Sequence, residues 1–166
     1  MLSKLLKTFR RQERSRLVFE RTGETVPGCP RGLYTINPDG TDIRQVRDKG
    51  QSPQWSPDGQ WISFLEGTPD NNWLSSVFIA KPNGQEVRQL TFHTDVDATP
   101  ASWSPDSRHL TYSLWLWQEK KYQLCTVDIQ TAEWRHILYS EDAIYPVWSP
   151  CNKILFNQYS DLHLPQ

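Results

Sequence analysis

The tripeptide Trp-Ser-Pro occurs three times along this chain in the same local setting, and no other feature constrains the fold as much. The copies begin at Trp55, Trp103 and Trp148, so they lie 48 and 45 residues apart. Each follows a proline by two or three residues and precedes a polar turn and an alternating apolar stretch. A period of ~40–45 residues is typical of a four-stranded propeller blade. The spacing therefore predicts a tandem array of such blades.

A strand–turn–strand pattern recurs between the Trp-Ser-Pro copies, over residues 32–46, 76–90 and 122–137. Two of its turns carry Asp39-Gly40 and Asn83-Gly84, which are typical of tight hairpins because glycine accepts the positive φ that these turns need. Each repeat is therefore written as four strands, A to D. Strand A ends at the tryptophan, the Ser-Pro segment forms the A–B turn, and strands C and D form the hairpin.

Counting these strands predicts an incomplete ring. The chain starts with a B-C-D unit at residue 16 and finishes with an A-B unit. We predict an all-β fold with a short N-terminal helix over 1–15, followed by a partial β-propeller over 16–166. It has about three to three and a half four-stranded antiparallel blades, with repeats at 16–46, 51–91, 99–138 and 144–166. Propellers usually close with about four to eight blades. Because open sheet edges favour association, the chain is part of a larger propeller, pairs with a copy of itself, or is an open arc with capped ends.

Composition excludes several classes of function. The 166 residues include 37% hydrophobic and 22% charged residues, which is typical of a globular domain. A formal net charge of −1 argues against a nucleic-acid partner. Cys29, Cys125 and Cys151 are odd in number and widely spaced, so we expect reduced, mostly buried thiols rather than disulfides or a zinc site. No secretion signal is recognised, so the expected location is the cytoplasm, or the periplasm if the N-terminus is incomplete.

The repeats resemble the WD-like blades of the TolB family. The likeness is carried by Pro53–Gly59 with Ile62 and Phe64, and by Ala80–Gly84 with the repeat end at Gln89–Thr91. Residues 99–113 match again with Asp106-Ser107 in place of Asp-Gly, and the third copy departs further with Cys151-Asn152. The resemblance implies a propeller used mainly for protein–protein contact. Similar blades also accompany the catalytic domain of prolyl-oligopeptidase-like peptidases, so the alternative is a propeller fragment beside a hydrolase that binds peptide or glycan.

The residues of the repeat motif are interpreted as structural. A serine nucleophile would need a base and an oxyanion hole, and it often lies in a G-x-S-x-G turn, which is missing here. Serine, proline and aspartate at a strand end instead favour a turn in which the carboxylate accepts backbone N–H groups. We therefore predict a non-enzymatic scaffold with no catalytic residue and no cofactor. The motif residues are Trp55, Ser56, Pro57, Asp58, Trp103, Ser104, Pro105, Asp106, Trp148, Ser149 and Pro150.

The longer connections are predicted to share one face, called here the long-loop face. They comprise the B–C loops at 20–32, 65–76 and 113–122 and the D–A loops at 47–51, 91–100 and 139–145. The candidate binding residues on it are Trp73, Asp95, Asp97, Trp115, Trp117, Glu141 and Asp142.

Aromatic residues such as these often anchor protein interfaces, although they also pack over neighbouring blades, and we expect one of Trp115 and Trp117 to be buried. The acidic residues, with His93 nearby, could hold a hard cation or meet a basic partner. A solvated acidic rim is favoured, and no metal site is predicted.

The N-terminal segment places Leu2, Leu5, Leu6 and Phe9 on one face of a helix, with basic residues around the rest. Such a helix can lie on an anionic membrane surface or dock in a groove, or it can cover an exposed blade edge.

Deleting residues 1–14 separates these interpretations. If the helix binds membranes, flotation of the chain with anionic vesicles is lost while solubility is unchanged. If the helix covers a blade edge, light scattering shows that the truncated chain aggregates.

Overall fold

A computed structural model describes residues 16–22, 30–71, 74–138 and 143–158, and the predicted N-terminal helix lies outside them. The described residues form antiparallel β-strands and one 3-10 turn, η1 (Pro69–Asn71). The all-β prediction is therefore confirmed. No helix in these ranges is long and apolar enough to cross a membrane.

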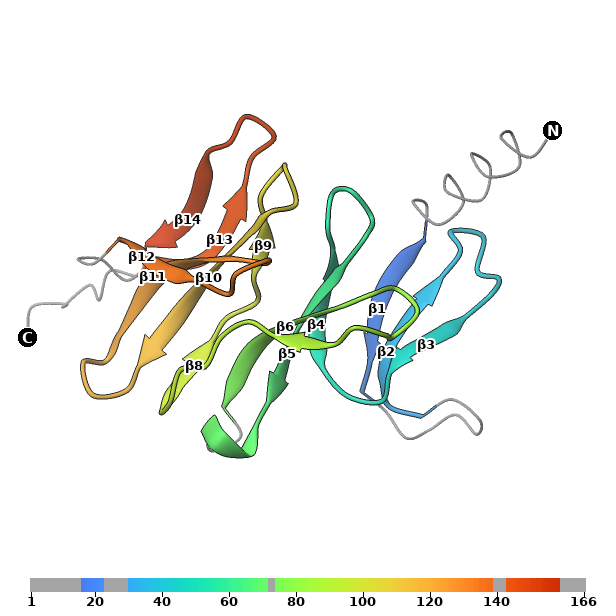
Figure 1. Cartoon of the computed structure of the whole chain (residues 1–166), viewed down its shortest axis with the longest axis horizontal. Coiled ribbons are helices and arrows are strands. Elements are labelled where there is room, and N and C mark those ends of the chain that lie inside the picture. Colours follow the sequence, from blue (N-terminus) through green and yellow to red (C-terminus); the bar gives the residue numbers. More distant parts are fainter. Residues whose placement is uncertain (1–15, 23–29, 72–73, 139–142, 159–166) are drawn as a thin grey trace, which may run out of the picture.

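Four sheets follow one another along an arc, from the N-terminal end at the right of Figure 1 to the C-terminal end at the left. We call them blades 1 to 4. Blade 1 contains β1 (Leu17–Arg21), β2 (Gly32–Ile36) and β3 (Arg44–Arg47). Blade 2 contains β4 (Gln51–Trp55), β5 (Ile62–Gly67), β6 (Ser75–Ala80) and β7 (Arg88–Gln89). Blade 3 contains β8 (Val96–Ala98), β9 (Ser102–Trp103), β10 (His109–Leu116), β11 (Lys121–Asp128) and β12 (Trp134–Leu138). Blade 4 contains β13 (Ala143–Trp148) and β14 (Ile154–Gln158).

The sheets follow the A-to-D order of the sequence repeat. Strand A is β4 in blade 2 and β13 in blade 4, and in blade 3 it is divided into β8 and β9, which both pair with β10. The division occurs at Pro100, and the other A strands have irregular registers at Ser52-Pro53 and Tyr145-Pro146. Because proline has no N–H to donate to a ladder, regular pairing is interrupted at this point of each repeat. Ser52 and Tyr145 have positive φ, as expected at a bulge.

The loops are shorter than the sequence predicted. Residues 96–98 were expected in a loop but form β8, and β10 and β11 extend into the predicted 113–122 loop, leaving only 117–120 as the turn. Both differences arise because Val96–Ala98 pairs with Leu114–Leu116 in a register that only the folded blade defines.

The core lies between successive blades. One cluster joins blades 1 and 2 through Leu33, Ile62 and Phe64. The other joins blades 2 and 3 through residues such as Ile79 and Tyr112. Alternate side chains of each strand point to opposite faces, so every inner blade contributes to the packing on both sides.

The tryptophan at the end of each strand A reaches back toward the preceding blade. Trp103 Nε1 donates to the Gln54 carbonyl oxygen of blade 2 at 3.3 Å. Trp148 Nε1 donates to Thr111 Oγ1 of blade 3 at 2.8 Å, and its backbone N donates to Ser102 Oγ. Trp55 packs toward blade 1, but its buried Nε1 has no hydrogen-bond partner in the described residues.

The A–B turns are held by serine and aspartate. Ser56 Oγ donates to Asp58 Oδ1 at 2.6 Å, and Ser104 Oγ donates to Asp106 Oδ1 at 2.5 Å. Each serine oxygen also accepts a backbone N–H from the start of strand B. Each hydroxyl thus bonds the aspartate of the turn and the backbone at the start of strand B. This local structure explains why serine and aspartate recur after the tryptophan.

Replacing Trp103 with phenylalanine should lower the free energy of unfolding by about 1–3 kcal/mol, because it removes a buried donor and part of a buried ring. Trp117→Phe is the matched control and should change stability by less than about 0.5 kcal/mol, since Trp117 is exposed. Urea unfolding of both variants provides the measurement. Equal stability of the two would show that the inter-blade bond contributes nothing.

Candidate functional site

The connections from strand B to C and from strand D to A lie along one edge of the arc. In Figure 1 this is the lower edge, where η1, the β10–β11 turn and the start of β8 lie near one another. The β4–β5, β9–β10 and β13–β14 turns lie along the opposite edge. The lower edge is therefore the long-loop face.

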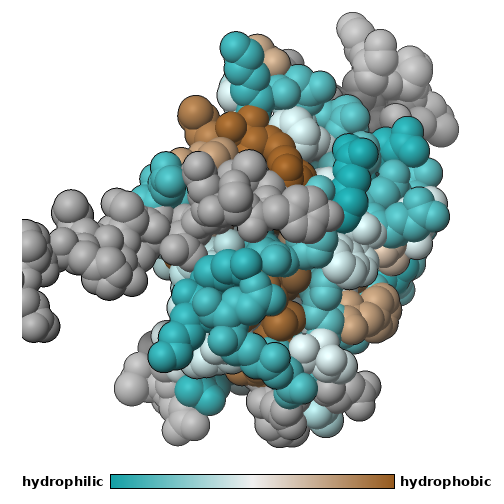
Figure 2. All heavy atoms as spheres, turned by 90° about the vertical axis from the view of Figure 1, so that its left-hand side faces the viewer, coloured by the Kyte–Doolittle hydropathy of each residue, from teal (hydrophilic) through white to brown (hydrophobic). Residues whose placement is uncertain are grey.

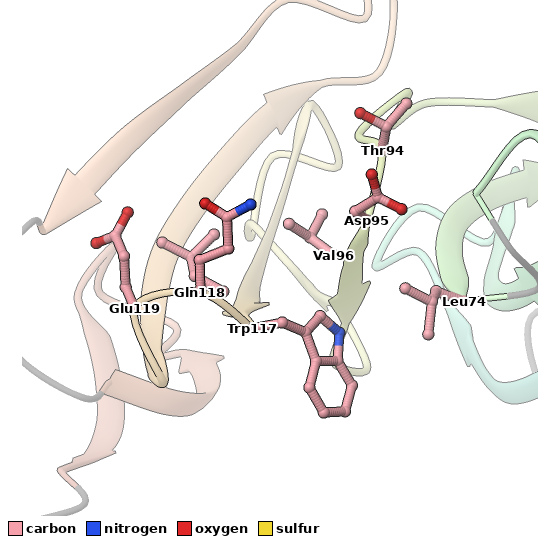
Figure 3. Close-up of a pocket in the computed structure, with 8 residues that line it drawn as sticks. Leu74, Thr94, Asp95, Val96, Trp117, Gln118 and Glu119 are labelled. Carbon is pink, nitrogen blue, oxygen red and sulfur yellow. The ribbon is translucent and has the colours of Figure 1, made fainter.

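A pocket of about 590 Å³ opens on this face between blades 2 and 3. Figure 3 shows the side chains around it. Apolar side chains from both blades and polar groups from the β7–β8 connection and the β10–β11 turn surround one space. Its lining residues are Leu74, Thr94, Asp95, Val96, Leu116, Trp117, Gln118 and Glu119.

Trp117 also lines a second pocket, of about 310 Å³, over the adjacent face of blade 3. This pocket contains Asp97, Trp115 and Tyr122, which lie opposite one another on β8, β10 and β11. The Trp115 ring lies 4.7 Å from the Tyr122 ring and 5.9 Å from the Trp117 ring, with the two indoles at 87°. We call Trp115, Trp117 and Tyr122 the aromatic ridge.

Exposure separates the members of the ridge. Trp115 is half-buried within the strand, whereas Trp117 is 55% exposed in the turn. The indole of Trp117 is therefore the exposed apolar part of the ridge. It meets the Trp115 ring edge-on, and Trp115 in turn packs against Tyr122.

The two aspartates of the site have different roles. Asp97 Oδ1 accepts a 2.8 Å hydrogen bond from the backbone N of Ser75, so it fixes the start of β6 against β8. Asp95 lies in the β7–β8 connection at φ 58°, a conformation that aspartate adopts more readily than most residues. Nearby, Asn71 Nδ2 donates to the Val96 carbonyl oxygen at 2.9 Å and joins η1 to the same strand.

None of the repeat-motif serines lines either pocket. The serines of the repeat motif lie in the A–B turns on the opposite edge and are engaged there. Within the ranges that the structure covers, no group of three or more His, Cys, Asp or Glu side chains could hold a metal ion.

Four of the seven candidate residues line these two pockets: Asp95, Asp97, Trp115 and Trp117. Trp73, Glu141 and Asp142 lie outside the described residues. Sequence reasoning missed Leu74, Val96, Leu116 and Tyr122. For Tyr122 a signal existed, because it lies across the β10–β11 turn from Trp115. Val96 and Leu116 come together through the pairing of β8 with β10, and Leu74 joins them when blade 2 packs on blade 3.

His93 belongs to a different environment from the acidic residues. Its Nε2 lies 3.2 Å from the Tyr112 hydroxyl and its ring meets Trp134 edge-on at 4.5 Å. Burial, with His136 nearby, lowers the pKa of His93 to about 4. Burial also raises the pKa of the Cys125 thiol to about 12.

The expectation of mostly buried thiols holds for Cys125 but is wrong for Cys151, which is exposed. The reason is that Cys151 occupies the A–B turn of blade 4, where its Sγ lies 3.3 Å from Ser149 Oγ.

Comparison with known proteins gives a fold and no family. No family model matches the chain, and no curated protein matches it. Among solved structures, TolB from Acinetobacter baumannii is similar with a TM-score of 0.67 at 14% identity, over 92% of this chain and 40% of that one. Oligogalacturonate lyase from Vibrio parahaemolyticus matches with a TM-score of 0.66 at 15% identity, over 91% and 45%. Puromycin hydrolase matches with a TM-score of 0.61 at 18% identity, over 86% and 25%.

The chain thus spans less than half the length of each of these proteins. The likeness establishes the blade architecture of TolB-like β-propellers, as the repeats predicted.

When the pKa of a histidine is lower in the folded chain than its unfolded value of about 6.5, the unfolded chain binds the proton more tightly, and the fold loses stability as pH falls below about 6.5. The free energy of unfolding should therefore decrease through His93 as pH falls from about 6.5 toward 4. We expect NMR to show a titration midpoint near 4 for His93, and His93→Phe to reduce the pH dependence of unfolding in this window. A midpoint near 6.5 would contradict the packing described for this ring.

Proposed function

We propose that this chain is a non-enzymatic, TolB-like propeller module that binds a protein through its long-loop face, with Trp117 as the anchor. The observation that carries the proposal is the position of Trp117, which is exposed, packs against the Trp115 ring, and borders both pockets. Interfaces depend on a few such aromatic anchors set in a surrounding rim.

The position of this site within the blades supports a binding role. Asp97 and Asn71 tie the loops around the pocket to backbone groups of the neighbouring segments. A surface held in place before binding loses less conformational entropy on association than a mobile one. The polar rim, with Asp95 and Glu119, favours a partner that brings hydrogen-bond donors.

A second function of a different class is favoured by the shape of the ridge. Two indoles at a right angle, with carboxylates nearby, suit a glycan or an extended peptide as well as a protein surface. The alternative proposal is therefore a module that accompanies a hydrolase and binds its peptide or glycan substrate. Replacing Asp95, Asp97 and Glu141 together in an activity screen separates the two, because a scaffold has no turnover to lose.

Self-association is also proposed, since the arc ends in open sheets at both sides and exposed edges favour pairing.

Trp117→Ala should weaken capture of the protein partner at least about tenfold, as expected when an interface anchor is truncated. Ile43→Ala is the control, because Ile43 is comparably exposed but lies between β2 and β3. Quantitative pull-down from a lysate of the source organism, with the melting temperature of each variant, provides the measurement. If Trp117→Ala folds normally and captures the same proteins in the same amounts, this site is not the binding surface.

A further inference from the structure

The first and last strands of the described chain, β1 and β14, occupy the same position of the blade repeat. β1 is a B strand because it pairs with β2, which is a C strand, and β14 is a B strand because it pairs with β13, which is an A strand. They are also alike in sequence: Arg16-Leu17-Val18-Phe19 corresponds to Lys153-Ile154-Leu155-Phe156. The intact blades keep this pattern, with Ile62 and Phe64 in β5 and Leu110 and Tyr112 in β10. The described residues therefore contain four B strands but three strands each of types A, C and D.

The C-terminal end of the arc presents an uncovered apolar surface. Leu155 is 66% exposed and Val147 is 53% exposed, and both lie on the face of blade 4 turned away from blade 3. Figure 2 looks onto this end and shows hydrophobic surface gathered there. In the described residues no strand pairs with the free edge of β14. Blade 4 thus has strands A and B and lacks C and D.

The N-terminal end is complementary, because in the described residues blade 1 contains strands B, C and D and no strand A pairs with β1. The orphaned Nε1 of Trp55 marks the place of the missing strand. In the next blade, Trp103 Nε1 donates to the carbonyl of Gln54, the residue just before the preceding strand-A tryptophan. If Trp55 follows the register of Trp103, its acceptor is the carbonyl of the residue that precedes such a tryptophan, and in β13 that residue is Val147. Trp148 differs, because its Nε1 donates to Thr111 Oγ1.

We propose that two copies of this chain exchange strands, so that β13–β14 of one copy replaces β1 of the other and supplies the missing strand A. Each junction then becomes one four-stranded blade, with A and B from one copy and C and D from its partner. This inference rests on the proposed self-association and gives it a specific mechanism. It does not depend on the long-loop site.

The register of the exchange follows from the pairs that β1 makes. Leu17 lies opposite Ile36 and Phe19 opposite Tyr34. In the exchanged dimer, Ile154 lies opposite the partner's Ile36 and Phe156 lies opposite the partner's Tyr34. Phe156 then takes over the ring stacking of Phe19 on Tyr34, which has a centroid distance of 5.8 Å.

The polar contacts of β1 also have replacements. The Arg16 guanidinium donates to Thr35, Asn37 and Asp42. Lys153 brings a cation to the same position and replaces the charge opposite Asp42, but not the full set of hydrogen bonds. The Glu20 carboxylate accepts from the backbone N of Ser52, a role that the Asn157 side-chain oxygen can fill.

The exchange therefore restores the strand pairing and the ring stacking that β1 provides, and it adds the burial of Val147 and Leu155 and an acceptor for Trp55. The match of Lys153–Phe156 to Arg16–Phe19, position by position, favours a second copy as the occupant.

Exchange also gives a closed ring. Each copy contributes two complete blades, blades 2 and 3, and half of each of the two hybrid blades. The total is six blades, which lies within the range of about four to eight at which propellers close. End-to-end contact without exchange would place two B strands in one junction, and the extra strand would have no place in a four-stranded blade.

The test locks β1 onto β2. Leu17 and Ile36 are directly opposed in an antiparallel pair, a separation that a disulfide can bridge. In a Cys29→Ser, Cys151→Ser background, a Leu17→Cys, Ile36→Cys chain joins β1 to its own sheet when oxidised. Sedimentation equilibrium of the full 166-residue chain should give twice the monomer mass for the wild type and for the reduced variant, and the monomer mass for the oxidised variant.

Two results would overturn the proposal. A wild-type chain that is monomeric at about 100 μM excludes exchange and self-association together. An oxidised variant that remains dimeric, with its disulfide verified by mass spectrometry, excludes exchange while leaving self-association by another surface.

A second pair of variants does not depend on disulfide chemistry. Leu155→Asp places a charge on the exchanged strand and should raise the dimer dissociation constant at least about 100-fold, the effect expected when a buried anchor is lost. Phe92→Asp is the control, since Phe92 is exposed but lies in the connection between β7 and β8, and it should leave dimerisation unchanged. Equal dimerisation of the two variants would contradict the exchange.

Discussion

The contact between each strand-A tryptophan and the preceding blade is the interaction on which the rest of the structure depends. A single four-stranded sheet buries too little apolar area to be stable alone, so each blade needs neighbours on its faces. Trp103 provides such a contact by packing within the core between blades 2 and 3 while its Nε1 bonds to the Gln54 carbonyl. The same geometry explains the repeat, because proline, serine and aspartate position that tryptophan and turn the chain into the next strand.

This dependence accounts for how far the sequence predicted the fold. The Trp-Ser-Pro period reported the strand-A tryptophans of blades 2 to 4, of which Trp103 and Trp148 bond to the preceding blade. The class, the strand order and the incomplete ring could therefore be predicted from it. The division of strand A at Pro100, the φ of Tyr145 and the pairing of β8 with β10 could not, because they depend on how one irregular strand lies against its neighbour. The exposure of Cys151 follows from a turn that departs from the repeat.

The candidate site was predictable in part, for the same physical reason. Trp115 and Trp117 stand out in the sequence as aromatic residues near a loop. The expectation that one of them is buried is wrong, because Trp115 is half-buried and Trp117 is exposed. Residues two apart along a strand lie on the same face, so alternation does not separate them. Leu74 and Val96 carry no such signal. Leu74 joins the pocket only through the packing of blade 2 on blade 3, and Val96 lies beside the β10–β11 turn only through the register of β8 on β10. Asp97 was expected at an acidic rim, yet its hydrogen bond to the Ser75 backbone makes it a structural residue. The blades thus supply a fixed support, and the loops on one edge carry the surface available for binding.

Hydrogen exchange of the indole N–H groups tests this account most directly. In a ¹⁵N-labelled chain, the indole protons of Trp103 and Trp148 should exchange far more slowly than that of the exposed Trp117, at every protein concentration. The Trp55 indole should become equally protected as the concentration rises and copies assemble, because its acceptor then comes from the partner. Indoles of Trp103 and Trp148 that exchange as fast as Trp117 would contradict the claim that these residues bond the blades together.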